Sequence, residues 1–121
     1  MEKNKNNHKE LQEQYKQMKT YMGVYQITNK ANGKIYISSF PNLKNRWMLL
    51  QNELETGRHM NLQLQRDYKE QNPDDFLYEV LEEKATDEVN DVRWAVKQME
   101  NAWLEKLQPY GDKGYNRPPK E

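Results

Sequence analysis

The sequence predicts an α+β fold in which a small three-stranded antiparallel sheet is flanked by helices, in the order β-β-α-α-β-α. Three observations lead to it: two strand-like segments joined by a turn, two helical apolar stripes after them, and a separate strand-like segment before a last long helix. The chain of 121 residues is long enough for one modest core. We therefore expect one domain over residues 21–117, with an N-terminal extension over 1–20 and a tail over 118–121.

The first twenty residues are expected to form a polar N-terminal helix or extension. They are rich in Lys, Glu, Gln and Asn, and their stripe of Leu11, Tyr15 and Met18 is too short to predict a coiled coil. No secretory signal, membrane-spanning run or cysteine is found in the sequence. We therefore expect a soluble cytoplasmic protein with no membrane partner and no disulfide.

A β-hairpin is predicted next, formed by the segments Gly23 to Thr28 and Lys34 to Ile37. Both segments are rich in β-branched and aromatic residues, and Asn32-Gly33 supplies the turn between them. A third strand is predicted at Phe76 to Leu81, which has the same kind of composition. These three segments are the strands of the expected sheet.

Two helices are predicted between the hairpin and the third strand. Pro41 and Asn42 stop the hairpin and open the first helix, and Gly57 fits its C-terminal cap. The second begins near Asn61 and ends before Pro73. Their expected buried residues are Leu43, Trp47, Leu50 and Leu54 in the first helix and Leu64 and Tyr68 in the second.

The last helix is predicted to start after an N-cap at Thr86 or Asp87 and to end before Pro109. Its apolar stripe consists of Val89, Val92, Val96, Met99, Trp103 and Leu107. The tail that follows is too rich in Gly and Pro to form a regular element. Any ordered role for the tail must come from docking of individual side chains.

Charge is balanced over the whole chain but uneven along it. Lys plus Arg and Asp plus Glu each number 19. Residues 34–69 hold six basic residues against three acidic ones, whereas residues 82–105 hold seven acidic residues against three basic ones. The pattern is compatible with a basic nucleic-acid-binding face, but charge alone favours two ordinary solvated faces.

Five short segments together resemble the GIY-YIG nuclease family, in order and in spacing. These segments are Gly23-Val24-Tyr25, Tyr36-Ile37-Ser38, Lys44-Asn45-Arg46-Trp47, Glu100-Asn101-Ala102-Trp103 and Gly114-Tyr115-Asn116. Each is a weak signal alone, but five in register are hard to produce by chance. The fold of that family, a three-stranded sheet with flanking helices, agrees with the order of elements predicted from periodicity. The resemblance also points to a bacterial or phage protein.

The resemblance implies hydrolysis of a phosphodiester bond with one divalent cation, Mg²⁺ or Mn²⁺. Tyr25 and Tyr36 would position the attacking water or accept its proton. Arg46 would bind the phosphate, and Glu100 would hold the metal through a carboxylate oxygen. Asn116 would form a hydrogen bond near the site. Without the resemblance, the two tyrosines are ordinary sheet residues, Arg46 and Glu100 are solvated helix residues and Asn116 is a turn residue.

The sequence departs from the family pattern at several positions. Ser38 replaces a glycine, so its hydroxyl would either crowd the phosphate or form a hydrogen bond with it. Leu50 stands where relatives usually carry Tyr or His, although it also fits the apolar stripe. Ser39 stands where some relatives have a lysine. His59 resembles a histidine of phage relatives and is a candidate catalytic residue, whereas an isolated histidine is more often on the surface.

Two functions are compatible with these residues. The first is an endonuclease that cuts nucleic acid, with DNA the expected substrate, and with little sequence specificity because no reading domain follows. The second is a catalytically degenerate module that binds nucleic acid or a protein partner. In both cases the expected nucleic-acid-binding residues are Lys34, Lys44, Arg46, Arg58 and Arg66.

Overall fold

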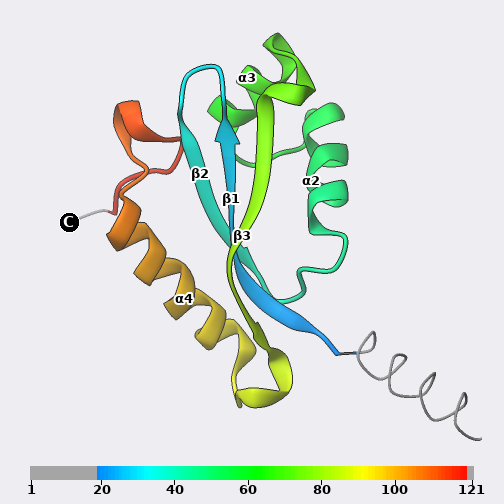
Figure 1. Cartoon of the computed structure of the whole chain (residues 1–121), viewed down its shortest axis with the longest axis vertical. Coiled ribbons are helices and arrows are strands. Elements are labelled where there is room, and N and C mark those ends of the chain that lie inside the picture. The colour runs from blue at the N-terminus through cyan, green and yellow to red at the C-terminus, as the bar shows by residue number, and fades with distance from the viewer. Residues whose placement is uncertain (1–18, 120–121) are drawn as a thin grey trace, which may run out of the picture.

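The computed structural model of the chain describes residues 19–119 and confirms the α+β fold. The predicted helix over residues 1–20 lies almost wholly outside this range. The sheet has the order β2-β1-β3 and is antiparallel throughout (Figure 1). Its strands are β1 (Tyr21–Asn29), β2 (Ile35–Phe40) and β3 (Phe76–Ala85), and the helices are α2 (Arg46–Glu55), α3 (Leu62–Glu70) and α4 (Val92–Leu107).

The hairpin of β1 and β2 forms around the predicted Asn-Gly turn. Gly33 has a φ of 79°, a left-handed conformation that favours glycine, and its N–H donates to the carbonyl of Asn29 at 2.7 Å. The ladder extends beyond the predicted strands and pairs Gly23 with Phe40. The polar residues Ser38 and Ser39 ended the apolar pattern in the sequence, but backbone pairing continues through them.

A bulge distinguishes the β1–β3 pair from the regular β1–β2 pair. Val24 pairs with Glu82 and Tyr25 pairs with Val80, so Leu81 is an extra residue on β3. Such a bulge increases strand twist and redirects side chains locally. Here it lies opposite the step between Val24 and Tyr25, beside a predicted site residue.

The helix starts differ from those predicted. Asn45 takes a left-handed conformation, with φ of 57°, so α2 begins at Arg46 and not directly after Asn42. The N-cap of α4 is Asp91, whose side chain accepts a hydrogen bond from the N–H of Trp94 at 3.0 Å. The predicted caps belong instead to a 3-10 turn, Thr86–Glu88. For α3 the predicted start is confirmed, because the Asn61 side chain caps the helix.

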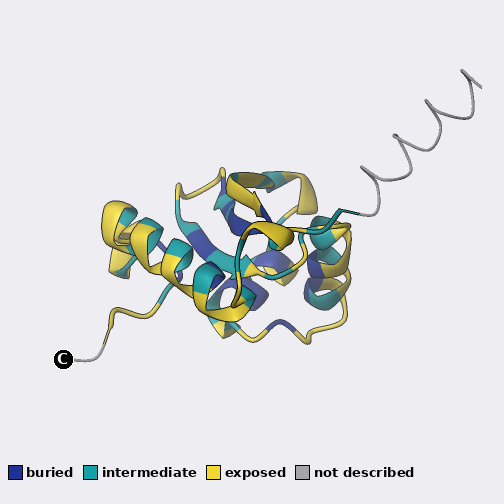
Figure 2. Ribbon diagram, turned by 90° about the horizontal axis from the view of Figure 1, so that it is seen from below, coloured by how far each residue is buried: buried dark blue, intermediate teal, exposed yellow. Residues whose placement is uncertain are grey.

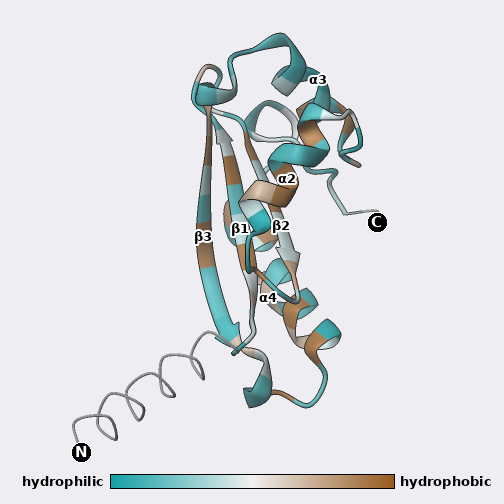
Figure 3. Cartoon of the chain, turned by 90° about the vertical axis from the view of Figure 1, so that its right-hand side faces the viewer, coloured by the Kyte–Doolittle hydropathy of each residue, from teal (hydrophilic) through white to brown (hydrophobic). Residues whose placement is uncertain are grey.

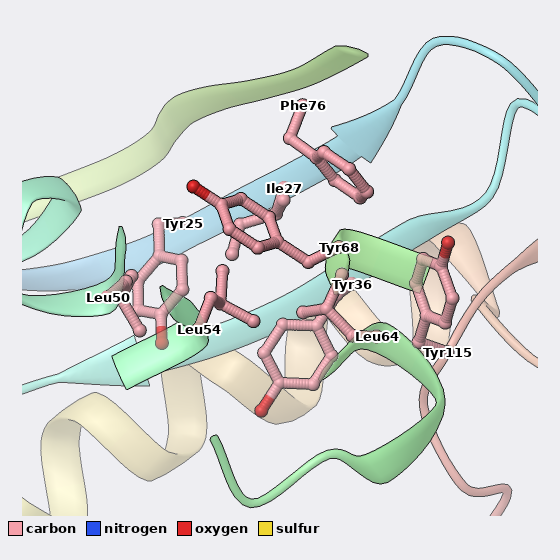
Figure 4. Close-up of a cluster of buried hydrophobic side chains, with 9 residues drawn as sticks. All are labelled: Tyr25, Ile27, Tyr36, Leu50, Leu54, Leu64, Tyr68, Phe76 and Tyr115. Carbon is pink, nitrogen blue, oxygen red and sulfur yellow. The ribbon is translucent and has the colours of Figure 1, made fainter. Parts of the chain in front are cut away.

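The main core lies between one face of the sheet and helices α2 and α3. Figure 2 colours the chain by burial, with the buried segments inside the molecule and the exposed segments on its outer side. Figure 4 draws its buried side chains, which are Tyr25, Ile27, Tyr36, Leu50, Leu54, Leu64, Tyr68, Phe76 and Tyr115. Helix α4 packs against β1 and β2. Ser39 on β2 neighbours Ser38 and so faces the other side of the sheet, where it contacts α4. Helix α4 therefore covers the face of the sheet opposite to α2 and α3. In α4 only Val96 of the predicted stripe is buried.

Hydropathy is distributed along the elements as a small core requires, with apolar and polar stretches alternating along the strands (Figure 3). No helix within residues 19–119 combines the length and the apolar character needed to cross a bilayer. The 3-10 turn Gly111–Lys113 opens the tail, which then runs beside β2 and pairs Gly114 with Ile35. The tail is thus held by backbone pairing as well as by the docked side chain of Asn116, whereas the sequence predicted docking by side chains alone.

Candidate active site

The two tyrosines of the hairpin point to the same face of the sheet, toward α2 and α3. Tyr25 pairs with Ser38 across the strands and Tyr36 pairs with Ile27, so their side chains are diagonal neighbours. Only 2% of Tyr25 and 7% of Tyr36 are exposed. In Figure 4 their phenol oxygens point to the same side, which is opposite to that of Tyr68. The pair can therefore present two hydroxyls to one bound group.

Both phenols are held in their protonated form. Burial raises the pKa of Tyr36 to about 12, and the neighbouring Tyr25 adds to this rise. Burial also raises the pKa of Tyr25. The Ser38 hydroxyl, as a hydrogen-bond partner, and the Arg46 charge act in the opposite direction at both phenols and lower their pKa. Ser38 therefore interacts with both tyrosines, and at neutral pH both phenols are hydrogen-bond donors.

Arg46 is the positive charge shared by the cluster. Its guanidinium carbon lies 3.9 Å from the centroid of the Phe40 ring and 6.0 Å from that of Tyr25. This stacking holds the side chain over the sheet at the start of α2. Its Nε is buried and has no hydrogen-bond partner among the described residues. The guanidinium therefore has unused donor capacity beside the two phenols.

His59 is buried, which excludes the alternative of a surface histidine. Only 4% of it is exposed, and its ring meets that of Tyr36 edge-on at a centroid distance of 5.3 Å. The N–H of Asn61 donates to Nδ1 at 3.0 Å, so the neutral ring carries its proton on Nε2. Burial lowers the pKa of His59, and the Arg46 charge lowers it further. The sequence pattern missed this burial because His59 lies in a loop without periodicity.

Glu100 lies on α4, and its side chain contacts Ser39 of the edge strand β2. The Ser39 hydroxyl donates to its Oε1 at 2.7 Å, and Lys97 Nζ lies 3.1 Å from its Oε2. The Glu100 side chain is only 15% exposed, so the carboxylate faces inward and is not that of a solvated helix residue. The Glu100 charge contributes to the raised pKa of Tyr36, so the two groups are close enough to interact electrostatically.

Asn116 fastens the tail to the free edge of β2. Its side chain exchanges two hydrogen bonds with the backbone of Ile37, between Tyr36 and Ser38. Gly114 beside it allows a close approach, because a Cβ there would collide with the carbonyl of Ile35. The site therefore lies around β2, with the tyrosines on one face, Glu100 toward the other and Asn116 along the edge.

Leu50 is 1% exposed and packs in the core beside Tyr25 (Figure 4). Its place in the apolar stripe is confirmed, and leucine can transfer no proton. Three other residues at the site were not identified as site residues from the sequence: Phe40, which stacks on Arg46, Ser39, which binds Glu100, and Lys97. The i,i+3 spacing of Lys97 and Glu100 was a sequence signal that could have identified Lys97 as a partner of Glu100.

The predicted nucleic-acid-binding residues lie in three places. Lys34 and Arg66 line one hollow, together with Tyr36 and Asn116. Lys44 and Arg46 line a second hollow at the start of α2, beside the stacked rings of Trp47 and Tyr78. Arg58 is exposed in the connection between α2 and α3. Four of the five predicted nucleic-acid-binding residues therefore line a hollow, two in each.

A metal ion at this site would depend on a single carboxylate. Within residues 19–119 no three His, Cys, Asp or Glu side chains converge in a way that could hold a metal. Glu100 supplies one hard oxygen ligand, and the Ser39 hydroxyl is next to it. This donor set fits Mg²⁺, which is commonly bound by one or two carboxylates with phosphate and water completing the coordination.

Comparisons with known proteins agree with this geometry. The chain is 30% identical over 85 residues to intron-associated endonuclease 1 of Enterobacteria phage T4, which is 70% of this chain but only 32% of that protein. The catalytic domain of homing endonuclease I-TevI superposes with a TM-score of 0.64 at 28% identity, over 81% of this chain and 99% of that domain. A mutant of the same catalytic domain gives a TM-score of 0.64 at 30% identity, over 82% and 93%. No family model matches the chain.

Proposed function

Because the chain belongs to the GIY-YIG nuclease family, we propose that it is an endonuclease that hydrolyses phosphodiester bonds of DNA with a divalent cation and little sequence preference. The observation that carries this proposal is the position of Arg46, whose guanidinium carbon lies 6.0 Å from the centroid of the Tyr25 ring. Tyr36 is the diagonal neighbour of Tyr25 and meets the ring of His59 edge-on, so the four side chains form one cluster. A guanidinium held beside buried hydrogen-bond donors can bind a phosphate group and stabilise charge that develops on it.

Arg46 binds the scissile phosphate in this proposal. Its stacking on Phe40 fixes the guanidinium plane, and its unpartnered buried Nε supports a role in hydrogen bonding to an added group. Charge accumulates on the phosphate oxygens in the transition state, and a guanidinium fixed beforehand stabilises it. Removing one such donor commonly costs about 10²-fold or more in rate.

Tyr25 and Tyr36 position the attacking water and the phosphate through their hydroxyl protons. The pKa of Tyr36, about 12, makes it a donor and not a base at neutral pH. His59 also acts as a donor, through Nε2, because its Nδ1 already accepts a hydrogen bond from the backbone of Asn61. The Ser38 hydroxyl supports both phenols, so its presence in place of glycine is compatible with this role.

Glu100 would hold the cation, Mg²⁺ or Mn²⁺, in this proposal. When bound, a divalent cation would lower the pKa of water and neutralise charge on the phosphate. Ser39 orients the carboxylate by donating to Oε1. Lys97 would have to leave Oε2 for a cation to be held there, and its 63% exposed side chain is able to move into solvent.

The alternative is a degenerate module that binds nucleic acid without cutting it. Two observations favour it: Leu50 offers no proton chemistry beside Tyr25, and Lys97 already neutralises Glu100. This alternative predicts binding that depends on salt but not on the divalent cation. The inward Glu100 is against it, because a module that only binds an anion gains nothing from a carboxylate at the site.

Cleavage of labelled single-stranded, duplex and branched DNA tests the proposal, with Mg²⁺, Mn²⁺ or EDTA present. The decisive variant is Glu100→Gln, which keeps the size of the side chain and removes its charge. Glu105→Gln, an exposed change on the same helix, is its matched control. We expect metal-dependent cutting by the natural chain and by Glu105→Gln, and none by Glu100→Gln. Binding without cutting in every condition would establish the alternative.

A further inference from the structure

A hollow lies between the start of α3 and the C-terminal tail, next to the proposed active site. Tyr36 and Asn116 belong to its lining, so the hollow and the site share a wall. On the rim, Met60 is 85% exposed and Leu62 is 75% exposed, the two highest values among the large apolar residues described. Two such side chains on the rim of a polar hollow suggest a site that contacts an apolar group of a ligand.

Three cationic side chains surround the hollow, against one acidic side chain. Lys34, Arg66 and Arg117 line it together with Asp112. The ammonium of Lys34 lies 5.7 Å from the centroid of the Tyr115 ring, which places it over an aromatic face. Neither ion pair found within residues 19–119 involves any of these three cations. The hollow therefore has the charge that a chain of phosphates would complement.

The wall of the hollow is held by hydrogen bonds between distant parts of the chain. Asn61 Nδ2 donates to the carbonyl of Tyr115 at 2.8 Å, which ties the cap of α3 to the tail. The hydroxyl of Tyr115 in turn donates to Asp67 on α3 at 2.7 Å. The hollow is thus formed before any ligand arrives, which limits the entropy lost on binding.

We propose that this hollow binds an unpaired strand of nucleic acid leading away from the scissile phosphate, with Lys34, Arg66 and Arg117 on its phosphates and Met60 and Leu62 against its bases. The inference rests on the proposed function, since it extends the substrate from the Tyr36 site. Base faces are available to apolar side chains only where the strand is unpaired or unstacked. The substrate class is therefore DNA with a single-stranded segment beside the cut.

The test separates phosphate binding from base binding in a cleavage-incompetent background. The Glu100→Gln chain in EDTA is titrated with a fluorescent thymidine oligonucleotide, an abasic strand of equal length and a duplex. One pair of changes is Arg66→Gln with Arg117→Gln, and its control is Lys84→Gln with Arg93→Gln, two exposed cations elsewhere. A second pair is Met60→Ser with Leu62→Ser, and its control is Leu49→Ser with Leu77→Ser.

We expect the first pair to weaken binding of both single strands and to reduce the salt slope by roughly 0.7 for each phosphate that the variant no longer neutralises. The second pair should weaken binding of the thymidine strand roughly fivefold, as expected if about half of an apolar side chain is buried on binding, and leave the abasic strand unchanged. The inference is wrong if the control pairs have the same effects, or if the duplex binds as tightly as the thymidine strand. Failure of the natural chain to cut DNA would overturn the proposed function alone, because these titrations do not involve cleavage.

Discussion

The side chain of Asn116 satisfies both backbone groups of Ile37. The N–H of Ile37 donates to Oδ1 at 2.9 Å, and Nδ2 donates to the Ile37 carbonyl at 2.7 Å. These groups belong to the free edge of β2, and the flanking residues Tyr36 and Ser38 face the proposed site. One amide therefore covers an exposed strand edge and fixes the strand that carries the tyrosine.

Asn116→Asp should destabilise the fold and slow cleavage. The carboxylate has no proton to donate to the Ile37 carbonyl, so an acceptor would face an acceptor. We expect a loss of about 1–3 kcal/mol in the free energy of unfolding, as for an unsatisfied polar group. Urea unfolding measures this loss, and Asn101→Asp, an exposed change on α4, serves as the control. Equal stability of the two variants would show that the pair of hydrogen bonds contributes nothing.

Leu50→Ala should reduce stability far more than Leu49→Ala. Leu50 is 1% exposed in the core, whereas its neighbour Leu49 on the same helix is 46% exposed. Removing a buried leucine side chain costs about 2–5 kcal/mol, and an exposed change is usually within about 0.5 kcal/mol. Thermal and urea unfolding check the difference. If Leu50→Ala were as stable as the natural chain, the structural role of Leu50 would have to be abandoned.

Tyr36 should make stability fall as pH rises above 10. The unfolded phenol loses its proton near pH 10, whereas the folded phenol keeps it until about 12. The unfolded chain therefore binds fewer protons in this window, and folding becomes less favourable as pH increases. Between pH 9 and 11 this one group should remove about 1.3 kcal/mol. Denaturation curves of Tyr36→Phe should lack this part of the loss of stability. A variant with the same pH dependence as the natural chain would contradict the prediction.

His59 should make the stability of the fold depend on pH below neutrality. Because burial lowers its pKa, the unfolded chain takes up a proton on this ring before the folded chain does. Its contribution to stability is therefore present above pH 6.5 and is lost as pH falls through the folded value. His59→Gln should be less sensitive to pH between 7 and 5 than the natural chain. A steeper fall in the variant would argue that His59 is charged in the folded protein.

The elements that the sequence predicted best are those with a local cause. The Asn32-Gly33 turn, the Asn61 cap and the buried Leu50 each depend on a backbone preference or a periodicity that a short segment contains. The cap of α4 was assigned wrongly to Thr86 or Asp87, because several capping residues follow one another and only tertiary packing selects Asp91.

The candidate site was predictable only through the family motifs. Hydrogen bonds such as Ser39 to Glu100 and Asn116 to Ile37 join residues 61 and 79 positions apart, and no local pattern encodes them. The stacking of Arg46 on Phe40 likewise depends on the left-handed turn at Asn45, which sets where α2 begins. The burial of His59 likewise depends on tertiary packing and not on a local pattern.

The most direct test of hydrolysis at this site is cleavage of DNA in water enriched in ¹⁸O, followed by mass spectrometry of the product ends. With Mg²⁺ present, we expect each break to incorporate one ¹⁸O atom into the terminal phosphate group. Arg46→Gln should lose cutting by about 10²-fold or more while remaining folded. Breaks without ¹⁸O, no breaks with any cation, or full activity in Arg46→Gln would contradict the assignment of this cluster as a hydrolytic site.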